Sequence, residues 1–108
     1  MDFTSFDSPI PPTAQSLNKP GAVTSDGTSL FVADSGNNRV LVYNPFPTAN
    51  NATASHVLGQ ADFTHNDVNA GSLTPTAQTL GFPFGISLNG GKLLVDDEDN
   101  ARFLIFGL

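Results

Sequence analysis

Two stretches of the chain, PTAQSLNKPGAVTSDGTSLFVADSGNNRVLVY (Pro12–Tyr43) and PTAQTLGFPFGISLNGGKLLVDDEDNARFLIF (Pro75–Phe106), are copies of one pattern. They align without a gap at an offset of 63 positions, and 13 of the 32 aligned pairs are identical. The tripeptide DFT precedes both, at Asp2 and at Asp62. A repeat of this length indicates one structural unit used twice. We place the first unit at residues 1–61 and the second at residues 62–108.

Each copy is predicted to contain three short strands. They span residues 22–25, 29–33 and 39–43 in the first copy and 85–88, 92–96 and 102–106 in the second. The apolar residues come in short runs bounded by Gly, Pro, Asn and Asp, which favours strands and turns over helices. Asp26-Gly27 and Asn89-Gly90 predict type I′ hairpin turns, because both central residues of that turn need positive φ.

The segments outside the two copies differ in character. Residues 55–59 are predicted to add a fourth strand to the first unit, whereas the second unit ends on its third strand. The polar connection that follows, as far as Leu80, suits a surface loop, either as plain decoration or as a binding loop. Because the strands are apolar on consecutive residues, we expect neighbours to cover both of their faces.

Composition narrows the classes of protein. The chain has 108 residues, a formal net charge of −6 and no Cys. The acidic balance argues against nucleic acid as a partner. The absence of Cys excludes disulfides and thiolate metal sites. No apolar run is long enough for a membrane helix, and the N-terminus lacks the pattern of a signal peptide, so we expect a soluble chain with no membrane partner. The cellular compartment stays open.

The repeated pattern resembles the NHL repeat. In the first copy the resemblance is carried by Pro20, Val23, Asp26, Gly27, Leu30, Val32, Asp34, Asn37, Arg39, Leu41 and Tyr43. In the second copy it is carried by Pro83, Gly85, Ile86, Gly90, Leu93, Val95, Asp97, Asn100, Arg102 and Phe106. The second copy departs from the pattern at residues 96–99 and at Ala101, as a diverged repeat would.

This resemblance implies an all-β fold, with two β-propeller blades of antiparallel strands of which the second lacks its last strand. Propeller blades bury their faces only by stacking on neighbours. We therefore expect the chain to be a fragment of a longer propeller or to complete a six-bladed one as a homo-oligomer, with a trimer as the simplest closed ring.

Six polar residues recur at equal spacing in the two copies: Asp34, Asn37, Arg39, Asp97, Asn100 and Arg102. An acid five residues before an Arg, across an Asn-containing loop, suits a structural bridge between two strands. The repetition itself favours a structural role, since a catalytic residue needs to occur only once. Asn37 and Asn100 can accept the left-handed conformation and bond to the backbone.

The acidic run around the second bridge is a possible ligand loop, formed by Asp96, Glu98 and Asp99. Several carboxylates can bind Ca²⁺, but the spacing of a calcium loop is missing, so a solvated loop without cofactor is favoured. His56 and His65 lack the spacing of a zinc site. The serines lack the context of a nucleophile.

Two functions follow as hypotheses from the resemblance. The first is a non-enzymatic scaffold or a module that binds a protein or small ligand, and that assembles with itself. The alternative is part of a metal-dependent lyase or lactonase, whose site would need further blades. A purely structural repeat fragment is a third possibility. The residues themselves identify no substrate.

Overall fold

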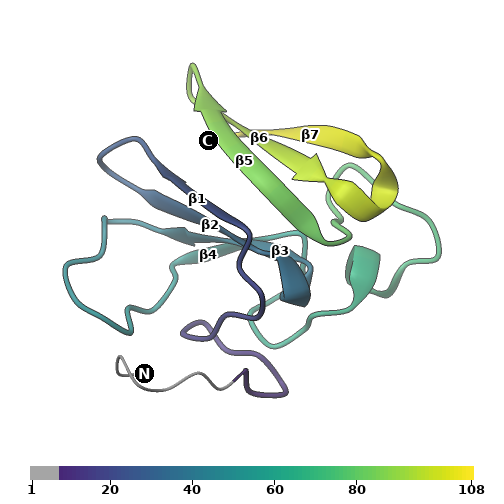
Figure 1. Ribbon diagram of the computed structural model, residues 1–108, viewed down its shortest axis with the longest axis horizontal. Coiled ribbons are helices and arrows are strands. Elements are labelled where there is room, and N and C mark those ends of the chain that lie inside the picture. Colours follow the sequence, from purple (N-terminus) through teal and green to yellow (C-terminus); the bar gives the residue numbers. More distant parts are fainter. Residues whose placement is uncertain (1–7) are drawn as a thin grey trace.

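Two antiparallel β-sheets that pack against each other make up the structure (Figure 1), a computed structural model that describes residues 8–108. The described part measures 36 × 33 × 19 Å. The expected all-β class is confirmed. The DFT tripeptide at Asp2 lies outside the described residues. None of the helical turns within residues 8–108 is long and apolar enough to cross a bilayer.

The first sheet has four strands in the order β1-β2-β3-β4. They are β1 (Ala22–Ser25), β2 (Leu30–Asp34), β3 (Arg39–Tyr43) and β4 (His56–Leu58). The predicted fourth strand is confirmed, although it is shorter than the sequence indicates. The register pairs Val42 with His56, so that β4 closes the far edge of β3.

The second sheet has three strands, in the order β5-β6-β7, within the described residues. They are β5 (Pro83–Asn89), β6 (Lys92–Asp97) and β7 (Arg102–Gly107). Each strand extends beyond its predicted bounds by one or more residues at one or both ends. In Figure 1 this sheet runs from green to yellow, with β6 between β5 and β7.

Neither of the two predicted hairpin turns has the expected geometry. In the first, Asp26 does not adopt positive φ. Its carboxylate instead accepts the backbone N–H groups of Thr28 and Ser29 at 2.9 and 2.8 Å, which closes a longer turn. In the second, the two-residue turn is one position later, because Gly90 and Gly91 both have positive φ, at 56° and 78°. Asp26 stays outside the left-handed region because an Asx bond satisfies the turn.

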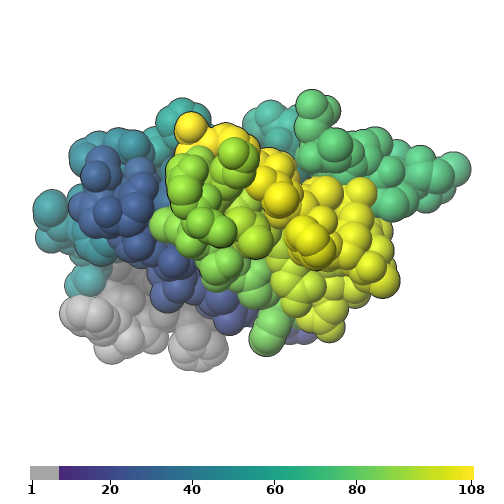
Figure 2. Space-filling model, turned by 90° about the horizontal axis from the view of Figure 1, so that it is seen from above, coloured from purple at the N-terminus to yellow at the C-terminus, as the bar shows by residue number. Residues whose placement is uncertain are grey.

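The core between the sheets is made by one face of each sheet. It consists of Phe31, Val40, Val42, Leu80, Leu93 and Val95, with Leu58, Ile86, Leu88, Leu104 and Phe106 packed around them. Figure 2 shows the second sheet, green to yellow, against blue residues of the first. The opposite face of the first sheet carries a second cluster, formed by Val32, Leu41, Tyr43 and Ala54. Strand β3 is therefore buried on both faces, as expected.

Three short 3₁₀ turns connect these elements. They are η1 (Ser35–Asn37), η2 (Val68–Gly71) and η3 (Glu98–Asn100). The turns η1 and η3 occupy equivalent places in the two hairpins, β2–β3 and β6–β7. Each ends at a left-handed residue, Asn38 with φ 54° and Ala101 with φ 53°.

Candidate functional site

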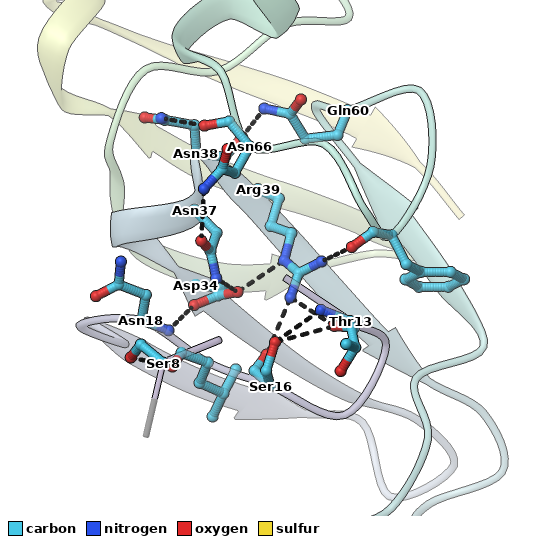
Figure 3. A network of polar contacts seen from close by, with 12 residues as sticks. Ser8, Thr13, Ser16, Asn18, Asp34, Asn37, Asn38, Arg39, Gln60 and Asn66 are labelled. Atoms are coloured by element: carbon cyan, nitrogen blue, oxygen red, sulfur yellow. Dashed lines mark hydrogen bonds and ion pairs between the residues drawn. The ribbon is translucent and has the colours of Figure 1, made fainter. Parts of the chain in front are cut away.

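Arg39, the first residue of β3, lies at the centre of a polar network (Figure 3). Its side chain is fully buried. Nε donates to Oδ2 of Asp34 at 2.7 Å, Nη1 donates to the carbonyl of Phe63 at 2.8 Å, and Nη2 donates to the carbonyls of Thr13 and Ser16 at 2.9 Å each. The guanidinium thereby fixes β3 to the segment before β1 and to the connection after β4.

Asp34 completes this network from the end of β2. Its Oδ1 accepts the backbone N–H of Asn18 at 2.6 Å, and its Oδ2 accepts Nδ2 of Asn37 at 2.9 Å besides the bond from Arg39. A buried ion pair offsets its desolvation only when its remaining donors and acceptors are bonded as well. We call Asp34, Asn37 and Arg39 the first clasp.

The second clasp repeats this geometry with Asp97, Asn100 and Arg102. Oδ2 of Asp97 accepts Nε of Arg102 at 2.7 Å and Nδ2 of Asn100 at 2.8 Å. Nη2 of Arg102 donates to the carbonyls of Thr76 and Thr79 at 2.6 and 3.0 Å. The Arg102 side chain is nevertheless 26% exposed. The two clasps share the arrangement of carboxylate, asparagine and arginine, and they differ in burial.

Both clasps bond to backbone carbonyls of the chain, and their structural role stays a prediction. Each clasp fixes the segment that precedes its sheet, a link between parts of the chain more than 20 residues apart. Asn37 and Asn100 do not adopt the left-handed conformation that asparagine tolerates, and Asn38 and Ala101 hold it. The amides of Asn37 and Asn100 are instead used as donors to the clasp carboxylates.

The proposed ligand loop is exposed. Asp96 lies in β6 with its side chain on the face opposite to the buried Asp97, and Glu98 and Asp99 lie in η3. Successive residues of a strand point to opposite faces of the sheet, so Asp96 is exposed whereas Asp97 is buried. Among residues 8–108, no three or more His, Asp or Glu side chains come together as a potential metal site.

The two histidines contact local partners. His56 begins β4, and its Nδ1 lies 3.1 Å from Oγ of Ser55. Nδ1 of His65 lies 2.7 Å from Oδ1 of Asp62 on the exposed connection. The hydrogen bond from His65, with others from Thr64, lowers the pKa of Asp62 to about 2, and the same bond raises the pKa of His65.

Asn38 is a contact residue that sequence reasoning missed. Its Nδ2 donates to the carbonyl of Asn66 at 2.9 Å, and its Oδ1 accepts the N–H of Phe82 at 2.7 Å. Its backbone carbonyl also accepts Nε2 of Gln60 at 2.9 Å. Asn38 therefore holds both ends of the connection that leads into the second sheet. The only sequence signal was that Asn38 and Ala101 differ between the copies.

Apolar side chains remain exposed on the outer face of the second sheet, which we define by Leu94, Phe103 and Ile105. Phe103 is 67% exposed and Ile105 is 54% exposed. Their counterparts at an offset of 63, Val40 and Val42, are 0% and 8% exposed because the second sheet covers them. The same positions are thus core in one sheet and surface in the other.

A hollow of about 610 Å³ opens between the first sheet and the end of β7. Its lining includes Phe31, Val42, His56, Leu58, Gly107 and Leu108. Shallower hollows lie on the outer face of the second sheet, about 320 Å³, and on the far face of the first, about 230 and 390 Å³. Within residues 8–108, these apolar surfaces are features suited to binding.

Comparison with known proteins adds no assignment, because no family model and no curated protein matches this chain.

Proposed function

We propose that the chain is a non-enzymatic repeat module of the NHL-type β-propeller class, a scaffold that binds by stacking its sheets on further copies. The observation that carries the proposal is the contact between its own two sheets. There, Phe31, Val40 and Val42 of the first sheet pack against Leu93 and Val95 of the second. This contact is a template for stacking a second copy.

Positions equivalent to both stacked faces are present, and those of the far face of the first sheet are already largely buried within one copy. The outer face of the second sheet is equivalent to the face of the first sheet that is buried in the template. The far face of the first sheet is equivalent to the face of the second sheet that is buried there: Leu30, Val32, Leu41 and Tyr43 correspond to Leu93, Val95, Leu104 and Phe106. Three copies would form six stacked sheets, and closing the ring leaves no end face exposed.

Charge supports the same arrangement. In the template, Phe82 and Pro83 lie against η1, where Asn38 accepts the N–H of Phe82 and Ser35 donates to the carbonyl of Pro83. At an offset of 63, Phe82 of the second copy corresponds to Lys19 of the first. In the same way, Ser35 of the first copy corresponds to Glu98 of the second. Lys19 and Phe82 also share positive φ, at 50° and 48°. Stacking therefore sets Lys19 of one copy beside Glu98 of the next.

The test is the solution mass of the chain by light scattering across a dilution series. We expect about three times the monomer mass of 11.3 kDa at high concentration. Lys19→Glu and Glu98→Lys should each shift the protein toward monomer, and the double exchange should restore the assembly. Asp62→Lys is the matched charge-reversal control, because Asp62 is 52% exposed on the connection outside both sheets.

Two results would contradict the proposal. A chain that is monomeric up to about 1 mM would lack association worth even about 4 kcal/mol. If the Lys19→Glu and Glu98→Lys variants assemble as well as the unchanged chain, the copies do not stack in the template's orientation. Because Lys19 and Glu98 are exposed, neither substitution should unfold the monomer.

A further inference from the structure

The tip of the β5–β6 hairpin combines an exposed carboxamide with two glycines. Asn89 is the last residue of β5 and is exposed. Gly90 and Gly91 form the turn, with φ of 56° and 78°. A Cβ placed on either glycine would meet no atom of the described residues within 4 Å. The tip therefore lies open to water.

Two groups at this tip are free to react with each other. Within residues 8–108, neither the side chain of Asn89 nor the N–H of Gly90 forms a hydrogen bond. Asn89 and Lys92 are the last pair of the β5–β6 ladder, and the ends of a ladder open at a low cost in free energy. The carboxamide carbon Cγ of Asn89 and the main-chain nitrogen of Gly90 can thus approach each other.

The counterpart hairpin shows the opposite arrangement. At an offset of 63, Asp26-Gly27 takes the place of Asn89-Gly90. There the N–H of Gly27 donates to Oγ of Ser25 at 2.9 Å. Oδ1 of Asp26 accepts the N–H groups of the two residues after Gly27, at 2.9 and 2.8 Å. Both the nitrogen and the side-chain carboxylate of the first hairpin are therefore held in place.

We propose that Asn89 is a site of spontaneous deamidation, in which the main-chain nitrogen of Gly90 attacks Cγ of Asn89. The new C–N bond closes a cyclic imide, and the bond from Cγ to Nδ2 breaks. Nδ2 leaves as ammonia, which takes up the proton of the Gly90 nitrogen. Water then opens the imide at either carbonyl and leaves aspartate or isoaspartate at position 89. Glycine favours this attack because it has no Cβ to shield the nitrogen and leaves the backbone free to rotate.

Either product changes the outer face of the second sheet. Ile86 and Leu88 pack toward the core between the sheets, so the side chain of Asn89 points to the opposite face. Deamidation therefore places a new negative charge on this face, beside Lys92. Isoaspartate also adds a methylene group to the main chain, which disturbs the pairing with Lys92. This site goes beyond the stacking described above, because one copy of the chain contains both reacting atoms.

The test follows the dilute, full chain during incubation at mildly alkaline pH by mass spectrometry of its proteolytic peptides. Dilution keeps self-association from covering the tip. We expect Asn89 to be modified first among the asparagines, with both aspartate and isoaspartate as products. The rate should rise with pH, because the attacking nitrogen must lose its proton. Asn89→Gln should abolish modification at this position, because its longer side chain would have to close a larger ring.

The first hairpin provides the matched control. Asp26→Asn creates a second Asn-Gly pair and keeps the oxygen that closes the turn. In the folded chain this site should react at least about tenfold more slowly than Asn89, because its three hydrogen bonds must open first. Adding Ser25→Ala frees the N–H of Gly27 and should narrow the difference. The proposal is overturned if Asn89 stays intact, or if it reacts no faster than the site created by Asp26→Asn.

Discussion

At the scale of single residues, the same type of ion pair has different consequences in different surroundings. His65 and Asp62 form a close pair, but their side chains are 61% and 52% exposed. Exposed pairs contribute little to stability because water and salt screen them. Their pKa values nevertheless respond to the hydrogen bond between them. This pair therefore reports on local structure and adds little to stability.

The pH dependence of this pair follows from the directions of its shifts. The raised pKa of His65 means that its contribution to stability is complete below about 6.5 and is lost as the pH rises through the folded-state value. The lowered pKa of Asp62 means that its contribution is present above about 3.8 and is lost as the pH falls toward about 2. We expect an NMR titration to give His65 a pKa above 6.5, and Asp62→Asn to lower it.

An unchanged titration of His65 in Asp62→Asn would show that the pair is not formed in solution.

At the scale of elements, the clasps explain how short strands acquire a fixed place. Each clasp joins the two strands of a hairpin to the segment that precedes the sheet. Arg39 makes one bond that its counterpart does not repeat within the described residues, from Nη1 to the carbonyl of Phe63. The planar guanidinium suits this role, because it can donate in several directions from one buried position.

The difference in burial predicts unequal costs for equivalent substitutions. Arg39→Met leaves Asp34 buried without its cation, so it should lower the free energy of unfolding by about 3–5 kcal/mol. Arg102→Met should cost about 1–2 kcal/mol, because water can reach a partly exposed clasp. Urea denaturation of both variants provides the comparison. Equal losses would mean that burial does not set the strength of the clasps.

At the scale of the whole molecule, equivalent apolar residues differ because one has a neighbouring sheet and the other does not. Leu80 is fully buried between the sheets. Its counterpart Leu17 packs against the far face of the first sheet and is only partly buried. The difference measures what stacking adds to a position that the repeat specifies identically.

This asymmetry predicts how stability depends on assembly. Leu80→Ala should cost about 2–5 kcal/mol at any concentration. Leu17→Ala should cost about 1 kcal/mol in the dilute chain, since little apolar area is lost there. Its cost should rise at concentrations where the assembly forms. Thermal unfolding at two concentrations distinguishes the cases, and a cost for Leu17→Ala that is the same at both would argue against burial by a second copy.

Much of the local structure followed from the sequence. Strands β1 and β3 have the predicted bounds, and the apolar run from Arg39 to Tyr43 correctly indicated a strand covered on both faces. The pairing of Asp34 with Arg39 followed from the repeated spacing. The turn at Asp26 did not, because two alternative ways of closing a turn compete there, and the sequence does not specify the one chosen.

The sequence by itself determined the all-β class, the two repeated units and the residues of both clasps, because turn chemistry and strand periodicity act over a few neighbouring residues. Only the tertiary structure decided that Val42 is core while Ile105 is surface, and that Asn38 holds the connection between the sheets. The physical reason is that burial depends on what lies across the sheet. Identical positions in a repeat can have different neighbours in space.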